Sequence, residues 1–455
     1  MRWLRRAIHL IIGALLISIA SAEETRPNVI LILVDDFGRE TIGALGGESY
    51  QTPNIDQLAA DGITFEVCYA TPMCSPTRNM LLSGQYNFRN YTAWGEYRFG
   101  DHPTIANTLA KAGYNTAVTG KWHLGGWDKN PFGPTRAGFH RYATFNYPEQ
   151  LDEDDEGIAN FFWNTNLREK KSRNATPKFN RIGKAYSPAH FRDFSLEFIE
   201  DHAGKETPFF LYYPMILAHR PFTPTDLSED DGIEHRGRNG DKANFPEMVT
   251  YIDNTLGAIR QKLEETGQSV NTLVIFTADN GTDNVSDAKE LRSKWKGQTL
   301  KGGKYVPTER GANVPFFATW PGKIKPGTIY KKATDFTDFH VTLAKLAEAE
   351  MPKDLDGHDL TPVFLGEGDS TREYAYTWGV HEYSSKKYKT PVEYRAELLH
   401  ILRDERWKYQ SDNTLWDLQA GWPQGDPIPR GEQKEVRECM RTALRALRQS
   451  QPKLW

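Results

Sequence analysis

The chain has 455 residues, of which 38% are hydrophobic and 25% charged, as in a globular protein long enough for two domains and an ample core. Its formal net charge of -4 includes no large basic excess, which argues against nucleic acid as the main partner. Three cysteines are too few for a disulfide scaffold.

Residues 1–22 have the pattern of a secretory signal peptide. Arginines at positions 2, 5 and 6 precede an apolar run over residues 8–19, and Ala20-Ser21-Ala22 fits a cleavage site. The apolar run is shorter than the ~20 residues that a membrane span needs. We therefore expect cleavage after Ala22, export to a periplasm or beyond, and no stable membrane span.

Two apolar runs predict strands that end in polar residues. Residues 28–34 and 271–278 are rich in Ile, Leu and Val, which is typical of strands buried on both faces of a parallel sheet. Asp35 and Asp36 follow the first run, and Asp279 and Asn280 follow the second. Because ligand sites in open α/β sheets lie at the carboxyl ends of strands, we expect these four side chains to share one site.

The elements between these two strands alternate in type. Helices are expected at residues 54–62, 103–113 and 245–266, and strands at 115–119 and 209–213, so the sheet should be mainly parallel. Two polar stretches, 151–188 and 226–241, have the composition of surface insertions, which often shape pockets but more often are solvated loops.

A smaller unit is expected at the C-terminal end. A boundary near residues 366–371 would divide a domain of residues 23–368 from a subdomain of residues 369–455. Residues 373–378, 399–402 and 407–410 predict strands of a small antiparallel sheet, and residues 432–449 predict a helix packed on it.

The most informative motif is Cys-x-Pro-x-Arg, formed by Cys74, Pro76 and Arg78. A lone cysteine is most often a buried structural residue, but this spacing resembles the signature of the sulfatase family, whose cysteine is oxidised after synthesis to Cα-formylglycine. Segments 27–36, 120–125 and 276–281 also resemble sulfatase motifs, in the expected order, so the resemblance covers most of the mature chain.

The resemblance implies an alkaline-phosphatase-like α/β fold, with a large mixed, mainly parallel sheet flanked by helices and a smaller C-terminal antiparallel sheet with a helix. It also implies that the enzyme hydrolyses sulfate esters. Hydrated formylglycine has two geminal hydroxyls, one of which would attack sulfur while the other later expels sulfate.

The same resemblance implies a divalent cation held by Asp35, Asp36, Asp279 and Asn280, with the formylglycine made from Cys74 as a further ligand. Oxygen ligands suit Ca²⁺, with Mg²⁺ as the alternative. A single Asp at a strand end would more often cap a neighbouring helix. Two acidic pairs beside the signature make that interpretation much weaker.

Cationic residues complete the expected site. By resemblance, Arg78 holds the formylglycine in place, Lys121 contacts it and the sulfate, and His123 hydrogen-bonds one of its hydroxyls. His219, after the strand at 209–213, is the candidate acid for the leaving oxygen. Lys121 and His123 taken alone would most often be surface residues, and Arg78 could form an ordinary surface ion pair. A structural histidine in a turn is the less favoured alternative for His219.

Lys304 follows a Gly-Gly pair and is expected to bind a sulfate oxygen, with Lys301 as its rival. Glu309 follows five residues later. The sequence departs from the family pattern at Asn313, where an arginine is usual, so we expect altered support of this loop.

The substrate implied by the family is a sulfated carbohydrate, and the partner during maturation is a formylglycine-generating enzyme. Two other interpretations are a phosphodiester or phosphonate monoester hydrolase of the same superfamily, and an inactive glycan-binding homologue. If Cys74 is modified, Cys68 and Cys439 could pair, but two free buried thiols are the favoured expectation. The oligomeric state is left open.

Overall fold

The computed structural model describes residues 26–90, 97–126, 130–145, 162–163, 165–183, 185–228, 240–379, 398–419 and 421–449. The expected signal peptide and most of the stretch 226–241 lie outside these residues. No helix within the described ranges is long and apolar enough to cross a membrane.

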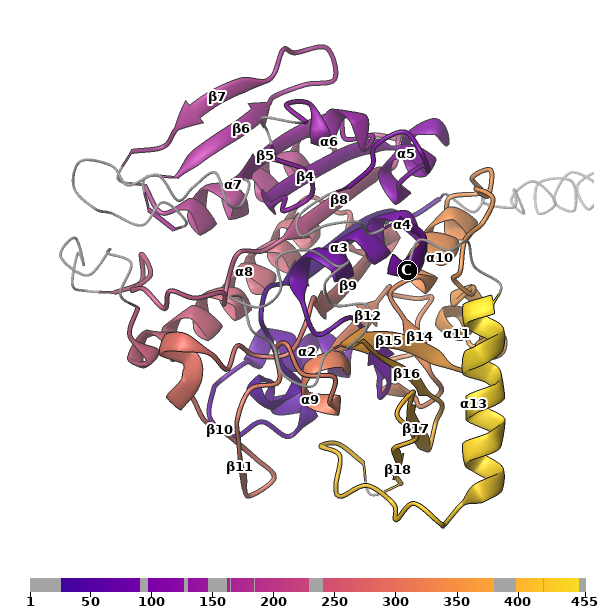
Figure 1. The fold of residues 1–455 in the computed structure, drawn as a ribbon. Coiled ribbons are helices and arrows are strands. Elements are labelled where there is room, and N and C mark those ends of the chain that lie inside the picture. Colours follow the sequence, from indigo (N-terminus) through magenta and orange to yellow (C-terminus); the bar gives the residue numbers. More distant parts are fainter. Residues whose placement is uncertain are drawn as a thin grey trace, which may run out of the picture.

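A large mixed sheet forms the centre of the molecule (Figure 1). Its strands, in spatial order, are β13 (Thr328–Tyr330), β2 (Ile63–Phe65), β12 (Phe316–Thr319), β9 (Thr272–Ala278), β1 (Asn28–Val34), β8 (Phe209–Pro214), β4 (Asn115–Lys121), β5 (Arg141–Phe145), β6 (Asn166–Lys170) and β7 (Lys178–Arg181). Strands β9, β1, β8, β4 and β5 are parallel to one another. The central strand β1 is almost wholly buried, as its unbroken apolar run predicts.

Helices flank this sheet in two groups (Figure 1). One group comprises α2 (Pro53–Ala60), α7 (Ser187–Glu200) and α8 (Phe245–Glu265), and the other comprises α3 (Cys74–Ser83), α5 (Ile105–Lys111) and α10 (Asp338–Leu346). Shorter helices are α4 (Asn87–Asn90), α6 (Gly133–Arg136), α9 (Glu309–Ala312) and α11 (Thr361–Leu365). The predicted strand and helix alternation is therefore confirmed, with ends shifted by a few residues.

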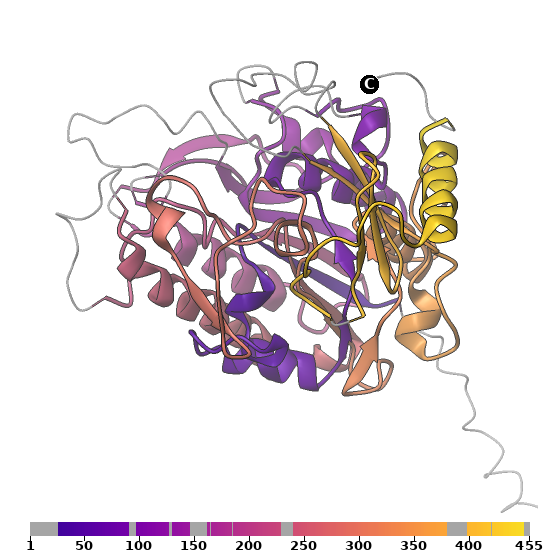
Figure 2. The same cartoon turned by 60° about the horizontal axis from the view of Figure 1, so that its bottom comes forward.

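A smaller antiparallel sheet follows, made of β15 (Ala375–Gly379), β16 (Leu399–Arg403), β17 (Trp407–Gln410) and β18 (Leu415–Asp417). Helix α13 (Lys434–Gln449) packs against β16 and β17, and Figure 2 shows it along the outer side of this sheet. Two further pairs are β10 (Ser293–Trp295) with β11 (Gln298–Leu300), and β3 (Cys68–Tyr69) with β14 (Thr334–Asp335).

Two expectations were wrong. Within 151–188, residues 166–181 form the antiparallel hairpin β6–β7 and extend the edge of the large sheet, with Leu167 fully buried. An edge hairpin keeps one side in solvent, so its polar composition looks like that of a loop. Cys68 and Cys439 are both free thiols, as expected, but Cys439 is exposed rather than buried.

Candidate active site

The ends of β1 and β9 bring two acidic pairs together. The strands are parallel, with Val34 opposite Ala278, so Asp35 and Asp36 leave the sheet beside Asp279 and Asn280. All four side chains are fully buried. The backbone N–H of Asp36 donates to Asp279 Oδ1 at 3.2 Å, and Asn280 Nδ2 donates to Asp36 Oδ1 at 2.7 Å. Asp36 has a φ of 55°, in the left-handed region that few non-glycine residues adopt.

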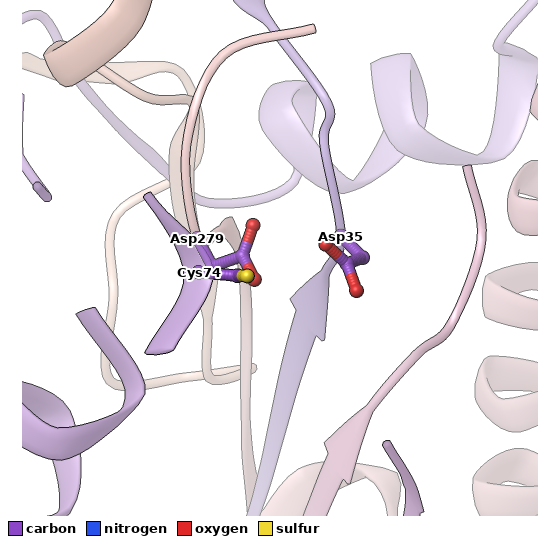
Figure 3. Close-up of side chains that lie close together, drawn as sticks. All are labelled: Asp35, Cys74 and Asp279. Carbon is purple, nitrogen blue, oxygen red and sulfur yellow. The ribbon is translucent and has the colours of Figure 1, made fainter. Parts of the chain in front are cut away.

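The Cys-x-Pro-x-Arg spacing is explained by helix α3. Cys74 is its first residue, and Arg78 lies four positions later on the same face. Thr77 fixes the turn before the helix, because its hydroxyl accepts the backbone N–H of Thr71 at 3.0 Å and donates to the Met73 carbonyl at 2.9 Å. Figure 3 shows Cys74 and Asp279 together with Asp35 at the end of β1.

Arg78 ties the helix to both strands. It is fully buried and donates from Nε and Nη2 to Asp279 Oδ2 at 3.0 and 2.7 Å. Its Nη2 also lies 3.3 Å from Asp35 Oδ2, and its Nη1 donates to the Lys121 carbonyl at 2.9 Å. This guanidinium therefore fixes the positions of three neighbouring parts of the site.

Lys121 and His123 enter from the end of β4. Lys121 is the last residue of that strand, and its Nζ forms an ion pair with Asp35 Oδ2. His123 Nδ1 lies 3.5 Å from Cys74 Sγ. The glycine before Lys121 is required, because Gly120 has a φ of 116° and a Cβ there would lie 2.1 Å from the Pro214 carbonyl oxygen.

His219 and Lys304 both approach one carboxylate oxygen of Asp36. Lys304 Nζ donates to Asp36 Oδ2 at 2.6 Å, and His219 Nε2 lies 3.8 Å from the same oxygen. His219 Nδ1 donates to the Arg220 carbonyl at 2.5 Å, which leaves Nε2 turned toward Asp36. Lys304 is the buried member of the lysine pair, with 1% exposure, whereas Lys301 is partly exposed. Of the two lysines, Lys304 is therefore the one that lies in this buried cluster.

Glycine is also required sterically in the Gly-Gly pair before Lys304. A Cβ on Gly303 would lie 2.1 Å from the backbone carbonyl carbon of Arg310. Asn313, at the position of the missing arginine, donates from Nδ2 to Glu309 Oε2 at 3.0 Å and accepts the backbone N–H of Cys68 at 3.0 Å. The shorter side chain therefore supports the loop through Glu309 and β3.

Burial and charge shift the protonation equilibria of the site. Burial, followed by Asp279, raises the pKa of Asp35 to about 8. Burial also raises the pKa of the Cys74 thiol to about 11, so the unmodified side chain is protonated near neutral pH. Burial, Lys121 and other cations hold the pKa values of His123 and His219 well below the usual range, which keeps both imidazoles neutral.

The oxygen atoms fit a hard divalent cation. Asp35 Oδ1 and Asn280 Oδ1 are buried and have no hydrogen-bond partner among the described residues. Such orphaned acceptors are rare in protein interiors, and a cation would satisfy both. Asp35, Cys74 and Asp279 place ligand atoms within 4.8 Å of one another, as do Asp35, Asp36 and His219.

Sequence reasoning missed two members of this cluster. Asp283 is buried, and its Oδ2 accepts from Arg220 Nε at 2.8 Å and lies 3.6 Å from Lys304 Nζ. Both residues were adjacent to the predicted set, since Asp283 follows Asn280 by three positions and Arg220 follows His219 directly. Their mutual contact spans 63 residues, and no local pattern encodes it.

Comparisons with known proteins agree with this geometry. Residues 27–349 match the Sulfatase family, and residues 304–441 match the family described as N-sulphoglucosamine sulphohydrolase, C-terminal. The chain is 32% identical to arylsulfatase A of Homo sapiens over 397 residues, which cover 80% of this chain and 74% of the relative. It is also 32% identical to N-acetylgalactosamine-6-sulfatase of Mus musculus over 387 residues, which cover 78% and 69%.

Solved structures share the fold. The crystal structure of Ps i-CgsB in complex with k-i-k-neocarrahexaose has a TM-score of 0.72 and 24% identity, covering 93% of this chain and 92% of that one. The phosphonate monoester hydrolase of Agrobacterium radiobacter has a TM-score of 0.65 and 21% identity, covering 93% and 96%. At these identities the likeness concerns the fold alone, and it confirms the expected architecture.

Proposed function

The chain belongs to the sulfatase family of sulfuric ester hydrolases, and from this premise we propose that it is exported and desulfates carbohydrates through a formylglycine made from Cys74. The observation that carries the proposal is the position of Cys74. This side chain is buried at the first turn of α3, 3.5 Å from His123 and within reach of Asp35 and Asp279.

The unmodified thiol is unsuited to the reaction. Burial raises the pKa of Cys74 to about 11, so little thiolate is present near neutral pH. A thiol also has no second hydroxyl with which to expel the sulfate. Oxidation of Cys74 to formylglycine removes both obstacles, and a formylglycine-generating enzyme is the partner that this maturation requires.

Asp35, Asp36, Asp279 and Asn280 would hold a divalent cation, Ca²⁺ or Mg²⁺, which when bound polarises a sulfate oxygen and lowers the pKa of the attacking hydroxyl. The two orphaned oxygens, on Asp35 and Asn280, support this assignment. With the carboxylates bound to this cation, the neighbouring Lys121 and Lys304 are available to an anionic substrate.

Side chains of the protein bind the sulfate and transfer the protons. Lys121 and Lys304, both buried beside the acidic pairs, bind the sulfate oxygens and stabilise negative charge as it develops. One hydroxyl of the hydrated formylglycine forms a bond to sulfur as its proton passes to solvent, and the bond from sulfur to the ester oxygen breaks. The leaving oxygen takes a proton from the Lys304 ammonium, or from His219 when that imidazole is protonated at Nε2. His123 accepts a proton from the second hydroxyl as the aldehyde re-forms and sulfate departs, and water rehydrates the aldehyde.

The substrate class is supported by the relatives. One is named N-acetylgalactosamine-6-sulfatase, and one structure of the same fold is a complex with k-i-k-neocarrahexaose. We infer a sulfated mono- or oligosaccharide as the substrate. The apolar run at residues 8–19, flanked by arginines and by Ala20-Ser21-Ala22, supports export.

The test is release of inorganic sulfate by protein co-expressed with a formylglycine-generating enzyme. The panel contains sulfated mono-, oligo- and polysaccharides and an aryl sulfate, and mass spectrometry of the peptide around residue 74 reports the modification. We expect Cys74→Ala to lose all sulfate release and Cys439→Ala, which alters an exposed free thiol, to retain it.

Two outcomes would redirect the proposal. If the modified protein releases no sulfate but hydrolyses phosphate or phosphonate esters, the alternative activity of the superfamily would be the correct one. A phosphonate monoester hydrolase shares the fold of this chain. Modified protein that binds sulfated glycans without turning over any ester would be an inactive binding homologue.

A further inference from the structure

Arg220 differs from the other cations of the site in its exposure. The side chains of Arg78, Lys121 and Lys304 are between 0% and 3% exposed, whereas that of Arg220 is 31% exposed. A guanidinium at this position can be reached by an anionic group that arrives from solvent. Its exposure places it at the rim of the buried cluster.

The backbone around Arg220 is firmly anchored. Met215 donates its N–H to the Leu33 carbonyl at 2.9 Å, and Ala218 donates to the Asp35 carbonyl at 2.7 Å. The N–H of His219 in turn donates to the Ile216 carbonyl at 3.0 Å. Arg220 therefore starts from a fixed point beside His219, one of the two residues proposed to protonate the leaving oxygen.

Asp283 orients the guanidinium of Arg220. Its Oδ2 accepts from Arg220 Nε at 2.8 Å and lies 3.6 Å from Lys304 Nζ, so Arg220 and Lys304 share one carboxylate oxygen. Asp283 is itself held by the backbone N–H groups of Asn284 and Val285, at 2.6 and 3.1 Å from Oδ1. The ion pair thus sets Arg220 next to the lysine proposed to bind sulfate.

The guanidinium of Arg220 is held through Nε by Asp283 and also hydrogen-bonds the side chain of Tyr305. Its two terminal nitrogens carry four N–H groups in the planar fork that matches sulfate and carboxylate oxygens, and one tyrosine hydroxyl cannot occupy all of them. A purely structural ion pair with a buried Asp would not require the arginine to reach solvent. Arg220 therefore has an exposed guanidinium, a fixed backbone and a carboxylate that it shares with Lys304. These features suit a group that binds an anion next to the sulfate that is hydrolysed.

We propose that Arg220 binds a second anionic group of the substrate, a sulfate or a carboxylate on the same or the adjoining sugar ring. This rests on the proposed function, because it takes the cleaved group to be a carbohydrate sulfate. The preferred substrates are then sugars with two sulfates, or with one sulfate beside a uronate, rather than sugars with one sulfate alone.

The test compares Arg220→Gln, Arg220→Lys and the parent enzyme on three substrates: a monosulfated sugar, its disulfated form, and a monosulfated disaccharide with a uronate. The parent should prefer the doubly anionic substrates in kcat/KM, and Arg220→Gln should reduce that preference about tenfold, mainly through KM. Arg220→Lys should fall between them, because it keeps the charge and loses the fork. The two doubly anionic substrates identify the second group as sulfate or carboxylate.

The matched control is Arg192→Gln on α7. Arg192 is 30% exposed and pairs with Asp193 at 2.8 Å, so it resembles Arg220 in exposure and ion-pair length but belongs to another part of the molecule. This variant should keep the parent's preference. If Arg220→Gln lowers kcat equally on all three substrates, Arg220 only positions Lys304 through Asp283 and the proposal is overturned.

Binding to the Cys74→Ala variant separates this inference from the proposed function. A preference for doubly anionic sugars that disappears with Arg220→Gln would support the anion site even if no sulfate were released. Sulfate release by the parent without any preference, in turnover or in binding, would leave the proposed function standing and refute the role of Arg220.

Discussion

Two buried clusters in this molecule hold an arginine between carboxylates. In one, Arg372 contacts Asp335 at 2.9 Å and Asp338 at 2.5 Å. All four oxygens of these carboxylates accept hydrogen bonds, from Arg372 or from groups such as Tyr86, Thr337 and the backbone of His358. This cluster is complete within the protein.

The other cluster surrounds Arg78 and is incomplete. Asp279 is satisfied by Arg78 and the backbone of Asp36, but Asp35 Oδ1 and Asn280 Oδ1 have no partner among the described residues. Burying polar atoms without partners costs stability, so their retention points to a ligand. The comparison teaches that a buried arginine and its carboxylates do not by themselves mark a functional site. What separates the two clusters is the pair of acceptors near Arg78 that no described residue satisfies.

The strongest test of this contrast replaces Asp35 by Asn. We expect sulfate release to fall about 10⁴-fold, or ~5.5 kcal/mol of transition-state stabilisation, because a proposed metal ligand and the partner of Lys121 are lost together. The matched change Asp335→Asn, in the complete cluster, should lower the urea midpoint but leave kcat of the folded fraction unchanged. Equal loss of activity in both variants would contradict the distinction between a functional cluster around Arg78 and a structural cluster around Arg372.

The complementary test is Arg372→Ala. Removing one partner of a buried ionic network should lower the free energy of unfolding by about 3–5 kcal/mol, measured by urea denaturation. Arg406→Ala is the control, since Arg406 is 49% exposed and pairs with Asp417 at 2.6 Å. Loss of this exposed pair should change the urea midpoint little, because solvent screens its attraction. A similar loss in the two variants would argue against a closed structural cluster.

Metal addition should distinguish the two clusters through stability rather than turnover. Ca²⁺ at about 100 times its dissociation constant should stabilise the folded protein by ~2.7 kcal/mol, and a chelator should reverse this. The stabilisation, followed as a shift in Tm, should persist in Arg372→Ala and disappear in Asp35→Asn. A shift that survives in Asp35→Asn would place the cation elsewhere.

The smallest expected effect concerns a single amide. Asn280→Ala should weaken Ca²⁺ binding about tenfold, or ~1.4 kcal/mol, measured by calcium titration of Tm or by calorimetry. Asn87→Ala is the counterpart, because Asn87 is equally buried but both of its amide atoms are bonded, to Trp378 Nε1 and to the Pro76 carbonyl. That variant should lose stability and keep its calcium affinity.

Much of the site could be predicted from local sequence. The apolar runs that become β1 and β9 place Asp35, Asp36, Asp279 and Asn280 at strand ends, since parallel strands end at a common edge. The spacing of Cys74 and Arg78 is one helical turn, and the glycines before Lys121 and Lys304 occupy positions where a Cβ would clash. These features depend on backbone geometry, which short segments encode.

Tertiary structure decided the rest. The hairpin β6–β7 gains its partner only from the edge of a sheet built by distant segments, so its sequence resembles a loop. The Arg220–Asp283 contact, the exposure of Cys439 and the burial of Lys304 rather than Lys301 likewise depend on which surfaces meet. Sequence by itself determined which functional groups lie at the end of each strand. Long-range packing alone determined which charges pair and which oxygens have no hydrogen-bond partner among the described residues. The reason is that burial and Coulomb energy depend on distances that no local pattern specifies.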